Sequence, residues 1–296
     1  MEHVNWGWPI ALDLFLAAMG AGAFMLAVMA DLAGGRRYRL VSGTGALVAP
    51  WPVICGVLLL VVDLGQPHRF WEMMLRRGED VALEFPFLMF NVTSTMSIGT
   101  WLLTAFVWIS LAYILVTILA YPFRWVNILK KLVGVAGLPF ALLVTIYTGV
   151  LLSASPNPLW NNFALPVVFV TSALVTGAAL VICVLAVLRV LGLVTDESAH
   201  IPKLERLNGG LVVVQILAVA AFVFLGLGSA PMLSVIGAGY GPLWWVGVVG
   251  LGLLLPLIVG LKGGLKRPQF SLVVSALVLL GGLFLRYVVV MAGQGA

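Results

Sequence analysis

The feature that most constrains this chain is a series of long apolar stretches, each the length of a membrane-spanning helix. The hydrocarbon core of a bilayer is about 30 Å thick and needs roughly 20 apolar residues per helix. Such runs are too long to be the short, alternating strands of a porin. The sequence therefore predicts an all-α integral membrane protein. Its eight expected transmembrane helices are residues 9–32, 41–63, 88–119, 132–154, 163–191, 209–230, 242–261 and 270–291.

Composition supports the same class. Hydrophobic residues make up 62% of the 296 positions and charged residues only 9%, against about 25% charged residues in a typical soluble domain. Asp13 interrupts the first apolar run and no basic segment precedes it, so we expect that helix to be retained rather than cleaved as a signal peptide. The even helix count and the polar loop 194–208 favour two four-helix sub-bundles, the first to fourth and the fifth to eighth helices, within a single domain, residues 1–296.

The distribution of basic residues predicts the orientation, because Lys and Arg near helix ends are retained in the cytoplasm. With eight helices, twelve of the sixteen Lys and Arg residues fall on one face, and seven of the eleven acids fall on the other. We therefore expect an inner-membrane protein whose termini are both extracytoplasmic, on the periplasmic side. Topology accounts for the net charge of +5, so nucleic-acid binding is not expected.

The cysteines and histidines do not form a metal-binding pattern. Cys55 and Cys183 both lie inside predicted helices and form no CxxC pair, which excludes an iron–sulfur cluster held by this chain. His3, His68 and His200 lie at or beyond helix ends, whereas a membrane cytochrome holds haem between histidines within its helices. We expect no haem and no metal site.

Polar residues gather in the extracytoplasmic half of the predicted membrane domain. Asp13, Asp63, Tyr147 and Arg286 all lie within about two turns of that face, on four different helices. The third helix adds amide and hydroxyl groups at Asn91, Ser94, Thr95 and Ser97. The opposite half offers only Asp31 and the basic loop residues, all expected near water, with little in the centre beyond Gln215.

Each of these groups also has a structural interpretation. In that interpretation Asp63 pairs with Arg69 or Arg286, and Tyr147 belongs to the aromatic belt at the membrane interface. The hydroxyl groups of the third helix then bond to the backbone of their own helix. Asp13 is harder to explain in this way, because a carboxylate at that depth is costly unless it is protonated, paired or facing a cavity. Taken together, the polar groups predict a pocket in one half of the membrane.

A quinol matches such a pocket. It has an apolar tail and a ring with two hydroxyls, so its site must open to lipid and supply hydrogen-bond partners. Its oxidation releases two protons, which requires an acceptor within about 3 Å. Asp13, Asp63 and His68 are the candidate proton carriers, and Tyr147 is a candidate ring contact. Arg69 and Arg286 are expected to hold the carboxylates and favour their charged form.

One connection is longer than the others. Residues 64–87, LGQPHRFWEMMLRRGEDVALEFPF, contain a possible short helix from about Phe70 to Arg77. Its aromatic and basic residues fit either a docking surface for a partner protein or an interfacial loop that anchors two helices. The sequence leaves both interpretations open. Because no redox metal is expected in this chain, electrons would pass to or from a partner on this surface.

Several motifs resemble those of the NrfD-type membrane subunits, a family that includes the membrane subunit of polysulfide reductase. The likeness extends through WPIALDLFLAAMGAGAFML, DLGQPHRFW, STMSIGTWLLTAF, YTGVLLSASPNPLW and GGLFLRYVVVMAGQ. The resemblance implies an eight-helix quinone-binding anchor without a cofactor of its own. It also implies two partners: a ferredoxin-like subunit with four [4Fe–4S] clusters, and a catalytic subunit that often contains molybdopterin.

The resemblance also implies roles for particular residues. The tyrosine that contacts the quinone in the family corresponds to Tyr147, and the acid beside the site corresponds to Asp63. A His and an Asn on the first helix of polysulfide reductase correspond to Asp13 and Ile10 here. Asp13 can keep a proton-accepting role, whereas the Asn contact is lost. His68 lies at a variable position of the DLGQPHRFW motif.

The sequence therefore predicts a quinone-reactive subunit of a respiratory oxidoreductase, with menaquinone or ubiquinone as the ligand and electron flow in either direction. Two alternatives remain. One is a secondary transporter with a pocket in the extracytoplasmic half, which paired Gly- or Pro-broken helices would favour. The other is a purely structural anchor.

Overall fold

The computed structural model describes most of the chain as one helical bundle. The described residues are 7–34, 38–63, 65, 68, 95–120, 126–154, 157, 159–194, 201–237, 239–261 and 268–294, and they contain helices and no strands. Eight helical segments among them are long and apolar enough to cross a membrane. The predicted fold class is confirmed.

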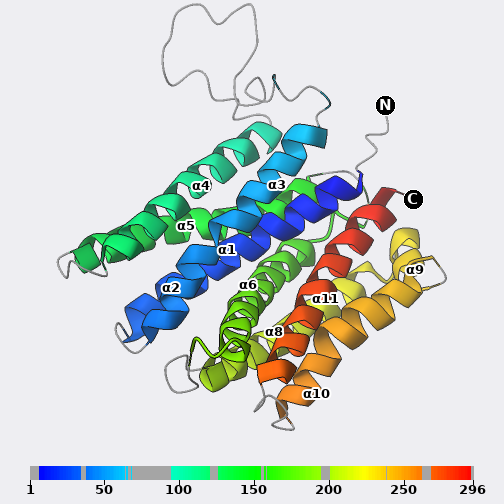
Figure 1. The fold of residues 1–296 in the computed structure, drawn as a ribbon. Helices are drawn as coiled ribbons and strands as arrows, with labels where there is room; N and C mark the ends of the chain where they lie inside the picture. Colours follow the sequence, from blue (N-terminus) through cyan, green and yellow to red (C-terminus); the bar gives the residue numbers. More distant parts are fainter. Residues whose placement is uncertain are drawn as a thin grey trace, which may run out of the picture.

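The helices follow one another along the chain as Figure 1 shows. They are α1 (Trp8–Gly34), α2 (Arg39–Val48), α3 (Pro50–Asp63), α4 (Thr95–Leu119), α5 (Val126–Ser153), α6 (Ala164–Val190), α8 (Ile201–Gly226), α9 (Ala230–Ile236), η4 (Leu243–Leu254), α10 (Leu255–Leu261) and α11 (Pro268–Gln294).

Three features of the helices differ from a simple series of eight. The second expected span is divided into α2 and α3 at Ala49, where Pro50 and Pro52 supply no backbone N–H to continue the first helix. The seventh consists of a π-helix, η4, followed by α10. A further short helix, α9, precedes it and is capped by the Ser229 hydroxyl, which accepts a hydrogen bond from the Met232 amide at 3.4 Å.

Two helices begin earlier than the sequence predicted. α5 begins at Val126 rather than near residue 132, and α8 at Ile201 rather than near residue 209. Both added segments contain Lys or Arg, which lowered their hydropathy. A helix can continue beyond the hydrocarbon into the polar interface, where long basic side chains reach water. The apolar pattern therefore marked the hydrocarbon-spanning part of each helix and not its full length.

Both termini lie at one end of the bundle, where α1 begins at Trp8 and α11 ends at Gln294 (Figure 1). We call this the N/C end. The successive spans alternate in direction, so that α3, α5 and α8 also end there and α4 and α6 begin there. Asp13 and Tyr147 lie in the half of the bundle next to the N/C end.

The hydrophobic core of the described residues has two large clusters and a small third one formed by Val116, Ala120 and Val126. One large cluster contains mainly buried side chains of α6, α8, α9, η4 and α11, and the other mainly those of α1 to α5. α1, α5, α6 and α8 contribute buried side chains to both large clusters. α1 and α6 pack closely because Gly22 and Gly177 lie at their crossing: a Cβ atom on Gly22 would overlap the Ala173 carbonyl group. Small residues that allow backbones to approach are a common basis of helix packing in membranes.

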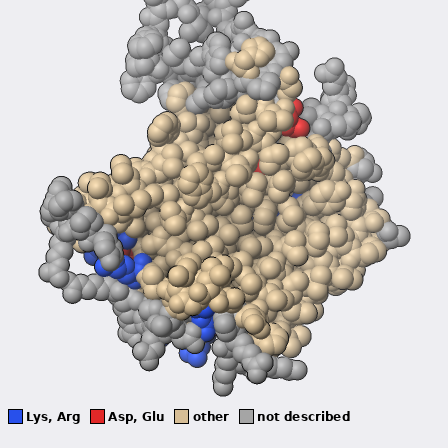
Figure 2. Space-filling model, viewed as in Figure 1, with Lys and Arg blue, Asp and Glu red and all other residues tan. Residues whose placement is uncertain are grey.

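The surface is apolar around the middle of the bundle. Large side chains such as Trp108, Phe224 and Leu217 are 66–75% exposed, which suits contact with lipid and not with water. Figure 2 shows this apolar surface, with Lys and Arg gathered at the end opposite the N/C end and Asp and Glu near the N/C end.

Candidate functional site

Asp13 is buried in α1, and one of its carboxyl oxygens is unpaired among the described residues. The residue is 4% exposed, and its Oδ1 atom has no hydrogen-bond partner in that part of the chain. Gly56 of α3 faces it, since a Cβ atom there would lie 2.5 Å from Oδ1. Burying a carboxyl group without a partner costs several kcal/mol, of order 2–7 for a neutral polar group and more for a charged one. This cost makes Asp13 a strong candidate for a functional residue.

Tyr147 of α5 packs against the backbone of α4. A Cβ atom on Gly99 would overlap the Cζ and hydroxyl atoms of the Tyr147 ring, so the ring occupies the place of a side chain on α4. The ring is only partly exposed, and the Asp13 carboxylate lies within electrostatic range of it. The hydroxyl donates no hydrogen bond to any of the described residues. The structure therefore brings together two predicted site residues, both with unused hydrogen-bonding capacity.

Gly56 and Gly99 were not identified from the sequence. Each makes room for a polar side chain on the neighbouring helix. The available signal was weak, since both are isolated glycines in apolar helices and such glycines are common in membrane proteins. Only the packing of α1 on α3 and of α4 on α5 shows which side chain each glycine faces.

Asp63 and His68 lie farther toward the N/C end and are exposed. Asp63 is the last residue of α3, seven positions after Gly56, a rise of roughly 10 Å along the helix. The structure does not bring these two residues into the buried group formed by Asp13 and Tyr147. Their exposure fits a position between that group and the aqueous phase.

Among the described residues Arg286 pairs with no carboxylate, which corrects the expectation that it holds Asp13 or Asp63. It is fully buried in α11 and donates from Nε to the Leu14 carbonyl at 3.2 Å, and from Nη1 to the Ser172 hydroxyl at 2.9 Å and the Gly282 carbonyl at 3.1 Å. Its guanidinium also lies over the rings of Phe15 and Phe169, at 5.7 and 5.2 Å. Arg286 therefore joins α11 to α1 and α6.

Three predicted site residues, Arg69, Asn91 and Ser94, lie outside the described residues. So does the expected short helix from Phe70 to Arg77. Of the segment 64–87, the structure describes only Gly65 and His68. The roles expected of this segment, as a docking surface or as an interfacial anchor, stay predictions.

Two residues of the SASPNPLW motif, Asn157 and Trp160, form hydrogen bonds to α11 at the N/C end of the bundle. Asn157 donates from its amide to the Gly293 carbonyl, and Trp160 donates from its indole to the Val289 carbonyl at 2.8 Å. Gly293 makes room for the Trp160 ring, which a Cβ atom there would overlap. This motif therefore ties the connection between α5 and α6 to the last turns of α11.

A buried ion pair lies toward the opposite end, which also corrects an expectation. Asp31 and Lys130 were expected near water, but their side chains are only 13% and 6% exposed, and Lys130 Nζ lies 3.0 Å from Asp31 Oδ1. Nζ also donates to the Ser42 hydroxyl at 2.9 Å and lies 5.6 Å from the Tyr113 ring centroid. This cluster joins α1, α2, α4 and α5.

Two cavities lie in the described part of the bundle, and no predicted site residue lines either of them. The part of the chain that the structure describes contains no group of three or more His, Cys, Asp or Glu side chains that could hold a metal ion. A cavity of about 710 Å³ lies between α8, α10 and α11, and a second of about 10 Å³ lies beside Gln215. Neither is lined by Asp13 or Tyr147.

The bundle and its buried polar groups define the class of protein. It is a multi-pass helical membrane protein with a buried acid and a phenol in the half of the bundle next to the N/C end. The family comparison is specific. The family model described as "Polysulphide reductase, NrfD" matches residues 1–296, and the chain belongs to this family. The resemblance inferred from the sequence motifs is confirmed.

Individual relatives cover nearly the whole chain. The NrfD protein of Escherichia coli (strain K12) is 31% identical over 99% of this chain and 96% of its own length. One chain of the polysulfide reductase of Wolinella succinogenes is 28% identical over 98% of this chain and 95% of its own length. One subunit of the selenate reductase of Mesobacillus selenatarsenatis is 22% identical, over 87% of this chain and 67% of its own length.

Proposed function

We propose that this chain is the quinone-reactive membrane subunit of a respiratory oxidoreductase complex. The observation that carries the proposal is the buried Asp13 Oδ1 atom, unpaired among the described residues, with the Tyr147 phenol nearby. A ring with two oxygens would supply a partner to each of these groups. The apolar surface of the surrounding helices suits a ligand that enters sideways from lipid.

The roles of the side chains follow from their chemistry. A bound quinol supplies two electrons and two protons. Asp13 accepts a proton from one ring hydroxyl, and the two electrons pass to the partner subunit. The Tyr147 hydroxyl hydrogen-bonds the other ring oxygen, holds the ring in place and relays the second proton toward Asp13 once Asp13 has released the first. Asp63 and His68 pass protons on to water at the N/C end. Arg69, Asn91 and Ser94 complete the proposed set of polar contacts. In the opposite direction of electron flow the same groups deliver protons.

The orientation is part of the proposal. The basic residues at helix ends in the described part of the chain lie toward the end opposite the N/C end, at the start of α2, α5 and α8 and the end of α6. They are Arg39, Lys130, Lys131, Arg189, Lys203 and Arg206. This distribution of basic residues supports a cytoplasmic position for that end. The quinone site and the termini then lie in the periplasmic half of the inner membrane.

Partners are proposed from the names of the relatives. Two of them are named as parts of a reductase. We propose that this chain exchanges electrons with a four-cluster ferredoxin-like subunit on the periplasmic face, which serves a catalytic subunit of the molybdopterin type. Co-purification tests this: an iron–sulfur partner with bound quinone supports the proposal, the partner without quinone supports a structural anchor, and neither supports a transporter.

Replacing Tyr147 with Phe is expected to lower quinol-dependent turnover of the purified complex about tenfold, because one hydrogen bond of about 1–1.5 kcal/mol is lost. Binding of a fluorescent hydroxyquinoline N-oxide, a quinol analogue, should weaken to a similar degree. Tyr113→Phe is the matched control, since Tyr113 lies in the Lys130 cluster and its loss should leave turnover unchanged. Equal rates for wild type and Tyr147→Phe would exclude the assigned contact.

Gly99→Ala tests the position of the same ring without changing its chemistry. The added methyl group would overlap the Tyr147 ring, so the ring must move, and a displacement of about 1 Å can cost 10²-fold in rate. Gly43→Ala is the control, since nothing lies within 4 Å of a Cβ atom at that position. The measurement is quinol-dependent turnover together with analogue affinity. If both glycine variants behave alike, the Tyr147 ring position has no role in turnover.

A further inference from the structure

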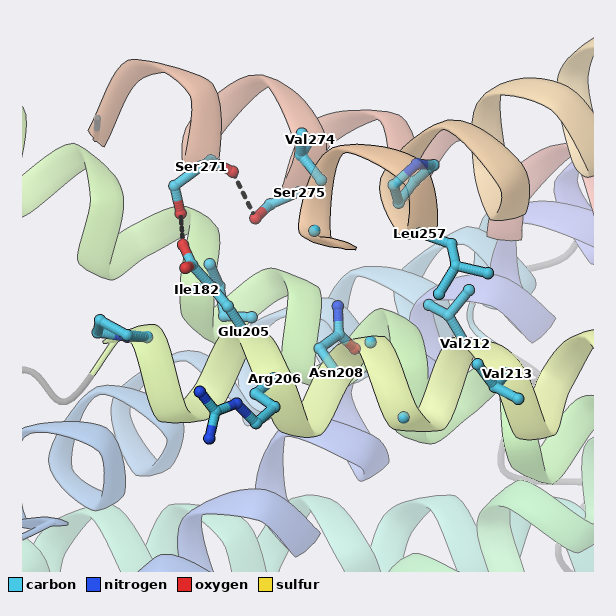
Figure 3. Close-up of a pocket in the computed structure, with 15 residues that line it drawn as sticks. Ile182, Glu205, Arg206, Asn208, Val212, Val213, Leu257, Ser271, Val274 and Ser275 are labelled. Atoms are coloured by element: carbon cyan, nitrogen blue, oxygen red, sulfur yellow. Dashed lines mark hydrogen bonds between the residues drawn. The ribbon is translucent and has the colours of Figure 1, made fainter. Parts of the chain in front are cut away.

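The large cavity lies at the end of the bundle opposite the N/C end, away from Asp13 and Tyr147. It is bounded by α8, α10 and α11 and has a volume of about 710 Å³ (Figure 3). Ligand pockets typically measure about 300–1,000 Å³. The cavity is therefore large enough for a ligand, and the proposed quinone chemistry does not use it.

Most of the cavity wall is apolar. Side chains of α6, α8, α10 and α11 line it, including Val212, Leu257 and Val274. Gly209 and Gly210 of α8 also line it, and nothing lies within 4 Å of a Cβ atom built on either. This open, apolar wall suits a hydrocarbon chain.

Asn208 is a buried polar group directed into this space. It is 8% exposed, and its Oδ1 atom has no hydrogen-bond partner among the described residues. Figure 3 shows its side chain projecting from α8 toward α10 and α11. A buried acceptor without a donor is destabilising. The cavity therefore lacks a hydrogen-bond donor at Asn208.

Two charged residues of opposite sign lie next to Asn208 on α8. Glu205 precedes it by three residues, on the same helix face, and accepts a hydrogen bond from the Ser271 hydroxyl at 2.5 Å. A carboxylate can accept several such bonds. Arg206 also lines the cavity and its side chain is exposed. The polar part of the cavity thus offers a carboxylate and an amide oxygen beside a guanidinium.

We propose that this cavity binds a zwitterionic phospholipid whose headgroup carries a primary ammonium, as in phosphatidylethanolamine. Arg206 binds the phosphate, Glu205 and Asn208 Oδ1 accept N–H bonds from the ammonium, and one acyl chain lies along the apolar wall. A choline headgroup has no N–H to donate, and an anionic headgroup has no positive charge for Glu205. A quinone headgroup offers only carbonyl oxygens to the Asn208 acceptor. The site is independent of the proposed quinone function.

The test is a lipid titration of the purified, delipidated full chain by native mass spectrometry. Phosphatidylethanolamine, phosphatidylcholine and phosphatidylglycerol with identical acyl chains are compared, with menaquinone as a further ligand. We expect phosphatidylethanolamine to bind about tenfold more tightly than the other two lipids, as the loss of hydrogen bonds worth about 1.4 kcal/mol requires.

Two variants connect that binding to the cavity. Gly209→Leu fills the open space and should abolish the preference, and Asn208→Leu, of similar volume, should reduce it about tenfold. Gly43→Leu is the control, because a Cβ atom there also meets nothing within 4 Å and Gly43 lies on α2, away from the cavity. Equal affinity for the three lipids, unchanged binding in Gly209→Leu, or displacement of the phospholipid by menaquinone would each overturn the proposal.

Discussion

Asp13→Asn is expected to reduce quinol-dependent turnover of the assembled complex by at least 10²-fold, which is the largest effect we predict. Positioned general bases contribute about 10²–10⁴-fold to a rate, and an amide cannot take up the proton. Because the amide keeps the size of the side chain, binding of the quinol analogue should change by no more than a few-fold. Turnover and analogue affinity measured on the same preparation separate the two effects.

The same variant has a second expected result. The buried Oδ1 atom of Asp13 has no hydrogen-bond partner among the described residues, so the carboxyl group destabilises the folded protein. The neutral amide should leave thermal stability unchanged or raise it while turnover falls. If Asp13 had only a structural role, the variant would lose thermal stability while the folded fraction kept its turnover. Full turnover in Asp13→Asn would remove the proposed proton acceptor.

Lys130→Met is expected to lower the free energy of unfolding by about 3–5 kcal/mol, because it leaves the Asp31 carboxylate buried without its partner. Lys130 Nζ lies 3.0 Å from Asp31 Oδ1 and 2.9 Å from the Ser42 hydroxyl, so one substitution removes both contacts. The cluster joins four helices, and the loss should appear as a single lowered transition. Denaturant unfolding in mild detergent measures it.

Lys131→Met is the matched control for this prediction. Lys131 is the next residue in α5 and its side chain is exposed, so its replacement should change stability by no more than about 0.5 kcal/mol. The double variant Asp31→Leu, Lys130→Met should recover most of the loss, since it removes both buried charges. Identical unfolding midpoints for Lys130→Met and Lys131→Met would show that the ion pair contributes nothing.

The sequence predicted the membrane spans closely because hydropathy is a local property. The expected span 163–191 corresponds to α6 (Ala164–Val190), and 9–32 corresponds to α1 (Trp8–Gly34). Errors arose where helices extend into the interface, as at the start of α8, and where prolines divide a span, as between α2 and α3. Neither feature changes the number of apolar residues in the part of the chain that crosses the hydrocarbon core, so hydropathy does not detect it.

The candidate site could be predicted only in part. The positions of Asp13 and Tyr147 along their helices placed both in the same half of the membrane, and the structure brings them within electrostatic range. The depth of Asp13 and Tyr147 in the membrane, however, does not predict Gly56 and Gly99. These glycines on neighbouring helices leave space for the two side chains. Lys130 was expected in water and is buried, because the rotation of α5 turns it toward Asp31.

The sequence alone determined the class of fold, the number of spans and the family, because each depends on the order of residues along the chain. Only the tertiary structure decided which polar groups are paired. Arg286 bonds to the Leu14 and Gly282 carbonyls and to Ser172, while the Asp13 Oδ1 atom is left without a partner among the described residues. The physical reason is that pairing between helices depends on their rotation and crossing, which are set by packing at close contacts such as that of Gly22 with Gly177.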